Sequence, residues 1–152
     1  MKNLSLKEKL LALCIRHVEE KISAAAEAMH SAQEAANEED KSSAGDKYET
    51  GRAMMQIERD NAAMQLDEAL KLKRTLDLIS ATGNHQVVSL GSVVITKTFR
   101  SFVAVGPGKL TVDGADYFIV TPMSPLGKIL FGLKAGMEFT FNNKTNTVLE
   151  IF

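Results

Sequence analysis

The feature that most constrains the fold is a heptad repeat of apolar and small residues near the start of the chain. The repeat alternates spacings of four and three residues. Its positions are Leu11, Ile15, Val18, Ile22, Ala25, Met29, Ala32 and Ala36. This spacing places one apolar stripe along a helix and predicts that a second helix packs against it.

A second helical pattern follows after residue 50. It runs through Met55, Ala62, Leu66, Ala69 and Leu76. The polar segment EEDKSSAGD, residues 38–46, separates the two patterns and contains turn and capping residues. Two helices with so short a connection predict an antiparallel hairpin. At 1.5 Å per residue, arms of about 33 residues would extend roughly 50 Å, and the change from Leu and Ile to Ala predicts a slim far end.

The rest of the chain has a different composition. All seven phenylalanines, all three prolines and eight of the ten glycines lie after residue 82. Residues 1–82 contain 12 basic and 15 acidic side chains, whereas residues 83–152 contain 6 and 4. This asymmetry predicts two modules, 1–82 and 83–152, joined at the segment SATGNHQ, residues 80–86.

The second module predicts strands. Five segments are rich in β-branched and aromatic residues: 92–98, 101–106, 116–121, 137–142 and 147–152. The segment 123–136 differs, because Ser124 is a plausible N-cap and Pro125 suits the first helical position. We therefore expect an α+β fold, in which an antiparallel coiled-coil hairpin precedes a small antiparallel β domain with one short helix.

Composition and charge predict a soluble cytoplasmic protein. Apolar residues make up 45% of the chain and charged residues 24%, values typical of a globular domain. No run of about 18 apolar residues predicts a membrane span, and the N-terminal segment becomes charged too early for a secretory signal. The single cysteine, Cys14, cannot form an internal disulfide. A net charge of −1 gives no general signature of nucleic-acid binding.

Several common sites are absent from the sequence pattern. The segment GPGKL, residues 106–110, lacks the glycine spacing of a phosphate-binding loop and predicts a turn. His17, His30 and His85 stand apart from one another and from Cys14, so no metal-ligand spacing exists. We expect these histidines to face solvent or the core, and Cys14 to be a small buried hydrophobe.

The connection between the helices is unusually acidic. Its charged residues are Glu38, Glu39, Asp40, Lys41, Asp46, Lys47 and Glu49. Ser43-x-x-Asp46 and Asp46-x-x-Glu49 both have the spacing of a capping box, and the spacing alone favours capping. If Ser43 is the cap, however, Asp46 and Glu49 lie three residues apart on one exposed helical face. Two such carboxylates at the end of a hairpin could share a hard cation such as Mg²⁺.

The chain resembles the Gre family of bacterial transcript-cleavage factors. The more specific match is YFIVTPMSPLGKILFGLKAGMEFTFNNKTNTVLEIF, residues 117–152. It is similar to that family's closing pattern of a strand, Ser-Pro, a short Leu/Ile helix, a Gly-Leu-Lys-x-Gly turn and two strands. The positions in register are Ser124, Pro125, Leu126, Lys128, Leu130, Gly132, Lys134 and Gly136. At the acidic connection, Gly45-Asp46-x-x-Glu49 matches the family's Gly-Asp-x-x-Glu.

The resemblance implies an FKBP-like C-terminal domain that docks on RNA polymerase. The residues expected in the docking surface are Ser124, Pro125, Leu126 and Lys128. The resemblance also implies that the coiled coil enters the polymerase's secondary channel, where Asp46 and Glu49 help to hold Mg²⁺ in the polymerase's own active site. The protein would thus be a monomeric elongation factor, not itself an enzyme and without a tightly bound cofactor, that stimulates cleavage of backtracked RNA.

Three alternatives stay open. The family usually has Leu-Ser-Glu-Asn-Ala-Glu-Tyr after Gly-Asp, whereas this chain has KYETGRAMM, residues 47–55. Lys47 and Gly51 alter this region, and a strong basic patch along the hairpin is missing, so a non-cleaving Gre-like regulator is one alternative. A folding helper with an FKBP-like peptide-binding domain is a second alternative, from another class. A purely structural dimer formed through the hairpin is the third.

Overall fold

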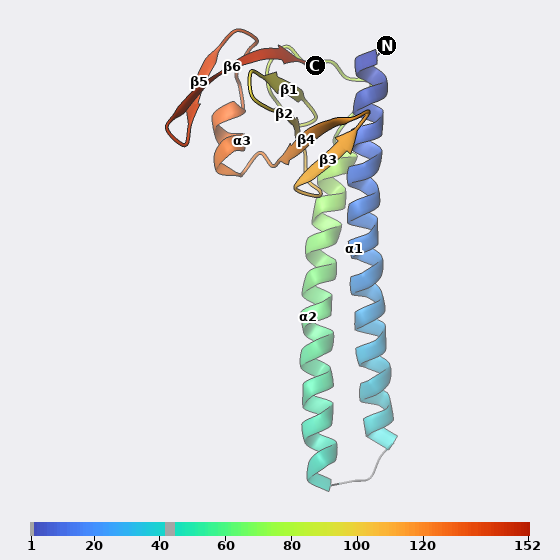
Figure 1. The fold of residues 1–152 in the computed structure, drawn as a ribbon. Helices are drawn as coiled ribbons and strands as arrows, with labels where there is room; N and C mark the ends of the chain where they lie inside the picture. Colours follow the sequence, from blue (N-terminus) through green and yellow to red (C-terminus); the bar gives the residue numbers. More distant parts are fainter. Residues whose placement is uncertain (1, 42–44) are drawn as a thin grey trace. The chain divides into compact units, whose positions relative to one another are not determined.

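The computed structural model of the chain describes residues 2–41 and 45–152, and the side chains of residues 5–38 and 50–152. Two long helices precede a mixed sheet with one short helix, which confirms the α+β class (Figure 1). The chain divides into two compact units, Met1–His17 with Arg74–Phe152, and Val18–Lys73. The predicted modules follow the change from helix to strand, whereas these units group the start of the first helix and the end of the second with the sheet.

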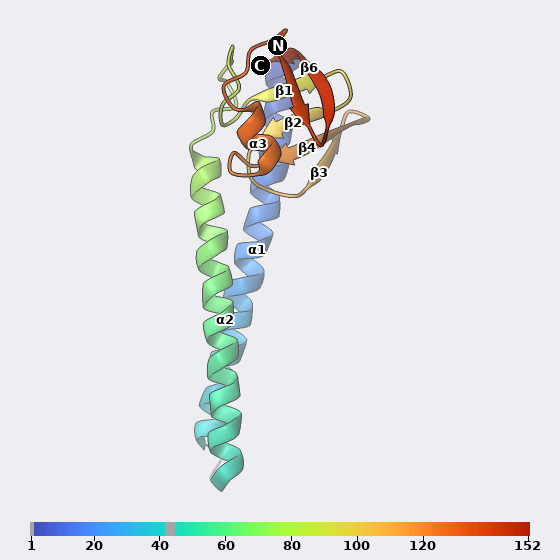
Figure 2. The same cartoon turned by 90° about the vertical axis from the view of Figure 1, so that its left-hand side faces the viewer.

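The two long helices are α1 (Lys2–Lys41) and α2 (Gly45–Asp77). In the unit Val18–Lys73 they lie side by side in two perpendicular views (Figures 1 and 2). Arg59 Nη1 on α2 donates to Gln33 Oε1 on α1 at 2.9 Å, whereas Ala25 and Ala69 line one groove. Residue numbers therefore rise along one helix as they fall along the other, and the predicted antiparallel hairpin is confirmed. No helix in the described ranges is long and apolar enough to cross a membrane.

Small side chains form the seam between these helices. The buried positions recur every seven residues, at Val18, Ala25 and Ala32 on α1 and at Ala62 and Ala69 on α2. Half-buried side chains occupy the alternate positions, among them Ile22, Met29 and Leu66. The predicted spacing of four and three residues is thus confirmed in the unit Val18–Lys73. Because interiors are closely packed, a seam built on alanine leaves little room for a larger side chain.

The other unit contains a six-stranded sheet with the order β3-β4-β2-β1-β6-β5. Its strands are β1 (Val93–Thr96), β2 (Arg100–Val103), β3 (Lys109–Val112), β4 (Ala115–Val120), β5 (Glu138–Phe141) and β6 (Lys144–Ile151), and helix α3 (Pro125–Leu130) follows β4. Five strands overlap the predicted segments, and β6 begins three residues before its segment. The sixth, β3, was not expected, although Asp113 and Gly114 form the tight turn that pairs it with β4.

One strand pair departs from the predicted antiparallel sheet. Strands β2 and β4 are parallel, with Ser101 opposite Phe118 and Val103 opposite Val120. The reason is the unexpected β3, because the β3–β4 hairpin brings the chain back so that β4 lies between β3 and β2. The sheet is therefore mixed, and the expectation of a wholly antiparallel sheet is corrected at this pair.

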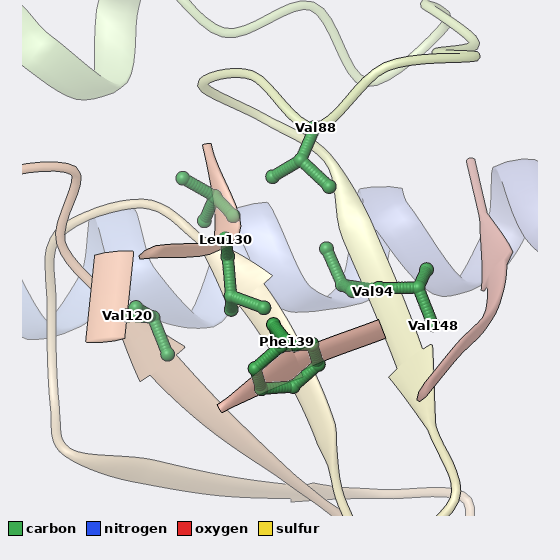
Figure 3. Packing of buried hydrophobic residues seen from close by; sticks show 7 residues of the cluster. Val88, Val94, Val120, Leu130, Phe139 and Val148 are labelled. Atoms are coloured by element: carbon green, nitrogen blue, oxygen red, sulfur yellow. The ribbon is translucent and has the colours of Figure 1, made fainter. Parts of the chain in front are cut away.

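The core of this unit is a cluster of aliphatic side chains with one aromatic ring. Its buried members are Val88, Val94, Val103, Val120, Leu130, Phe139 and Val148 (Figure 3). Leu130 belongs to α3 and is fully buried, and Leu126 and Leu133 pack against the same cluster. The short helix thus covers part of the sheet with Leu126 and Leu130, which lie four residues apart on one helical face.

The first turns of α1 belong to the same unit as the sheet. Leu10 and Cys14 are fully buried, and a Cβ added at Gly106 would lie 3.1 Å from Cys14 Sγ. Lys7 is only 2% exposed, and its ammonium group donates to the Gly83 carbonyl oxygen at 2.8 Å. Burial raises the pKa of the Cys14 thiol to about 12, so this cysteine is an inert core residue, as expected.

The alanine seam predicts that added volume destabilises the hairpin. We expect Ala69→Leu to lower the free energy of unfolding by about 1–3 kcal/mol, because Ala69 is 3% exposed and faces the partner helix. Ala28→Leu is the matched control at an exposed α1 position and should change stability by less than about 0.5 kcal/mol. Urea unfolding followed by circular dichroism measures both; equal stabilities would contradict the packing described here.

Candidate functional site

The acidic connection is the first candidate site. Helix α2 begins at Gly45, so Asp46 and Glu49 belong by sequence to its first turn. Their side chains, and the expected cap Ser43, lie outside the described part of the structure. The proximity of the two carboxylates therefore stays a prediction. Among the described residues, no group of three or more His, Cys, Asp or Glu side chains could hold a metal ion.

The second candidate site surrounds α3, whose start is fixed by a serine cap. Ser124 Oγ accepts a hydrogen bond from the Gly127 amide at 3.0 Å and donates to the Thr121 carbonyl oxygen at 2.7 Å. Pro125 occupies the first turn, where its missing N–H costs nothing. The cap and the proline position expected from the sequence are both confirmed. Ser124, which was expected in a docking surface, has its hydroxyl group committed to the helix start.

A glycine in α3 allows the helix to lie against the end of β4. A Cβ added at Gly127 would stand 1.9 Å from the Thr121 carbonyl oxygen and 2.9 Å from Ser124 Oγ. No side chain fits there unless the backbone moves. The sequence pattern around Gly127 held one signal of this contact, a glycine inside a helical segment. Glycine there costs about 1 kcal/mol relative to alanine, so its presence suggests a packing reason.

The fold itself requires many residues of the matched segment 124–136. Leu130 is fully buried and Leu126 packs against the core. Gly132 and Gly136 have φ angles of 87° and 90°, in the left-handed region that glycine tolerates best. Apart from these two glycines, the exposed positions of the match are Pro125, Lys128 and Lys134. Packing therefore does not explain why the two lysines agree with the matched pattern.

The outward face of α3 combines apolar and basic side chains. Pro125, Lys128 and Ile129 are spaced by three and four residues and lie opposite Leu126 and Leu130. Exposed apolar residues flank the helix, with Met123 76% and Phe131 50% exposed. We call Met123, Pro125, Lys128, Ile129 and Phe131 the α3 surface. It includes two of the four predicted docking residues, whereas the other two contribute to the cap and the core.

The histidines stand apart in the structure, as expected. His30 Nε2 lies 3.2 Å from Glu34 Oε1 on an exposed helical face, and His85 Nδ1 lies 2.7 Å from Ser89 Oγ. Burial lowers the pKa of His85, and the charge of Lys7 lowers it further. Burial also lowers the pKa of Lys7. This region is a structural joint in which two basic side chains, Lys7 and His85, lie near each other, and the sequence pattern did not predict their proximity.

Comparison with known proteins gives little guidance. No protein-family model matches the chain, and no curated protein matches it. A solved structure described as that of the transcription factor Gfh1 is similar over 91% of this chain and 93% of that chain. The sequence identity is 18% and the TM-score is 0.39. A likeness at this TM-score carries no argument about function.

The close approach at Gly127 predicts a strong local effect. Gly127→Ala should lower the free energy of unfolding by about 3 kcal/mol or more, because the added methyl group meets a backbone carbonyl. Gly108→Ala is the control, since a Cβ there meets nothing within 4 Å. Urea unfolding monitored by circular dichroism measures the difference. If both variants are equally stable, α3 does not lie against β4 as described.

The joint at His85 predicts a pH-dependent stability. Its folded pKa lies below the ordinary value of 6.5, so between these two values the unfolded chain binds the proton more readily. Stability should therefore fall as the pH is lowered through about 6.5, with a slope of at most about 1.4 kcal/mol per pH unit. His85→Gln should remove this part of the profile. An NMR titration placing the His85 pKa at or above 6.5 would refute the expectation.

Proposed function

We propose that this chain is a Gre-like accessory factor of RNA polymerase. In this proposal the hairpin enters the secondary channel and the α3 surface docks on the outside of the enzyme. The single observation that carries the proposal is the match over residues 124–136, where Lys128 and Lys134 agree with the family pattern although they are exposed. Agreement with the family pattern at positions that the fold requires supports only the domain type. Agreement at exposed positions supports a shared partner.

The helical pair has the dimensions that this role needs. Helix α2 contains 33 residues, which corresponds to about 50 Å at 1.5 Å per residue. The seam between α1 and α2 is built on alanine at Ala25, Ala32, Ala62 and Ala69. Small seam residues let the two backbones approach closely, so the hairpin is narrow for its length. Both properties support insertion into a channel.

The proposed chemistry uses the two carboxylates of the acidic connection. Asp46 and Glu49 would donate oxygen ligands to a Mg²⁺ ion held mainly by the polymerase, and would orient the attacking water. Their place in the first turn of α2 suits this role, because the positive end of a helix dipole favours the ionised carboxylate. The chain would supply two ligands and no complete active site, so hydrolysis remains an activity of the polymerase.

A non-cleaving regulator is the alternative within the same class. The residues Lys47 and Gly51, next to the two carboxylates, replace the family's usual neighbours. A lysine between two carboxylates weakens the local negative potential that attracts a divalent cation. Such a protein would bind the channel and block it without shortening RNA.

Backtracked polymerase complexes with labelled RNA test the proposal. Wild-type protein should shorten the RNA, and Asp46→Ala or Glu49→Ala should slow cleavage by at least about tenfold, since each removes a direct metal ligand. Glu58→Gln, at an exposed α2 position, is the matched control and should leave the rate unchanged. Wild type that binds the complex but shortens no RNA would establish the regulator instead.

Binding is measured separately from cleavage. Lys128→Glu reverses the charge on the α3 surface and should weaken binding to the polymerase, whereas Lys97→Glu, at an exposed position of the β1–β2 turn, should leave the affinity unchanged. A fluorescently labelled protein and purified polymerase give the two affinities. If the wild-type chain shows no measurable affinity for polymerase, both forms of the proposal are wrong.

A further inference from the structure

The β domain contains an aromatic groove that the proposed function does not use. The groove has a volume of about 570 Å³ and lies at the far end of the β5–β6 hairpin, next to the turn between β1 and β2. Its walls include Thr98, Phe99, Phe139, Phe141, Lys144 and Asn146. None of these residues belongs to the α3 surface. The volume lies within the range of ligand-binding pockets, about 300–1,000 Å³.

The apolar wall of the groove is a set of aromatic rings that reaches from the core to the surface. The Phe99 ring contacts Phe139 edge to face, with ring centres 6.3 Å apart, and contacts Phe118 in the same way at 6.5 Å. Phe139 is a core residue, and its ring lies among the buried side chains in Figure 3. Phe118 is 45% exposed and Phe141 is half-buried. A second apolar side chain can therefore extend this aromatic contact without rearranging the core.

The polar wall is held rigidly by Asn146. Its amide nitrogen donates to Thr98 Oγ1 at 2.6 Å and to Thr96 Oγ1 at 3.3 Å. Its amide oxygen accepts from the Lys97 amide at 3.2 Å and from the Thr147 amide at 2.8 Å. These bonds fasten the β1–β2 turn to β6. Because the wall is already ordered, a ligand would pay little entropy to shape it.

The charge at the groove is positive. Lys144 lines it and is exposed, and Lys97 lies in the adjoining turn with an exposed side chain. Glu138 precedes Phe139 on β5, and successive side chains of a strand point to opposite faces, so its carboxylate lies on the other face of the hairpin. The groove therefore favours a ligand that carries a carboxylate next to its apolar group.

The strand that forms one wall indicates the kind of chain that fits. Strand β5 stands at the end of the order found for the described sheet, and only β6 pairs with it there. An edge strand offers backbone N–H and C=O groups to an extended segment. A peptide can thus follow this edge while one side chain reaches the aromatic wall.

We propose that the groove binds an extended peptide segment of a partner protein, with an apolar or aromatic side chain against Phe99 and Phe141 and an adjacent carboxylate on Lys144. The aromatic contact supplies most of the affinity, because it removes a large apolar side chain from water. The exposed ion pair with Lys144 supplies selectivity for an acidic neighbour. This site is independent of the proposed polymerase role, since it uses neither the acidic connection nor the α3 surface.

NMR titration of the full ¹⁵N-labelled chain tests this site with defined probes. The first probe is a blocked pentapeptide with phenylalanine followed by glutamate at its centre; two others replace the phenylalanine by alanine or the glutamate by glutamine. The first should give saturable shifts at Phe99, Phe141 and Lys144. The alanine peptide should bind at least about tenfold more weakly, and the glutamine peptide about three- to fivefold more weakly.

Matched variants assign the contacts. Lys144→Gln should weaken binding of the glutamate peptide about three- to fivefold and leave the glutamine peptide unchanged, whereas Lys134→Gln should affect neither. Phe141→Ala should weaken both peptides, and Leu149→Ala, an exposed residue of the same hairpin, is its control. The lysine variants change only exposed side chains, so they test the site even if Phe141→Ala unfolds. Absent or unsaturable shifts, shifts that map elsewhere, or equal loss of both peptides in Lys144→Gln would overturn the proposal.

Discussion

The structure depends on the burial of the first turns of α1 beside the sheet. A domain of about seventy residues buries little apolar surface by itself, and here Leu10 and Cys14 add two fully buried side chains to its unit. Lys7 is buried in the same region, where its hydrogen bond to the Gly83 carbonyl oxygen offsets part of the cost of removing an ammonium group from water. The start of α1 is therefore part of the same compact unit as the strands.

Sequence patterns predicted the elements better than their arrangement. The seam of α1, the cap at Ser124 and five of the six strands follow local rules of spacing, capping and side-chain shape. Strand β3 has four residues, and its identity depends on pairing with β4 more than on its own composition. The parallel pairing of β2 with β4 and the burial of Lys7 arise from tertiary contacts. The local sequence around a charged residue or a short strand does not predict such contacts.

The candidate sites divide in the same way. Pro125 and Lys128 were expected in a docking surface and lie on the outward face of α3, whereas Ser124 and Leu126 serve the cap and the core. Periodicity could have separated these roles, because Leu126 lies four residues before Leu130 and therefore on the same helical face. The aromatic groove could not have been found in this way, since its walls come from two hairpins that are distant in sequence. The functional meaning of Asp46 and Glu49 rests on the sequence and on the resemblance that it carries.

The close approach of Gly127 to Thr121 has a consequence for how this segment can change over evolutionary time. Some positions contact a backbone carbonyl, adopt a left-handed turn conformation or pack in the core. These positions tolerate few replacements in any descendant, whatever its activity. The intervening outward positions are free to drift unless a partner holds them. Selection on folding and selection on binding therefore act on alternate residues of one short stretch. Divergence among relatives at Lys128 and Lys134, compared with constancy at Gly127, would report the history of the partner separately from the history of the fold.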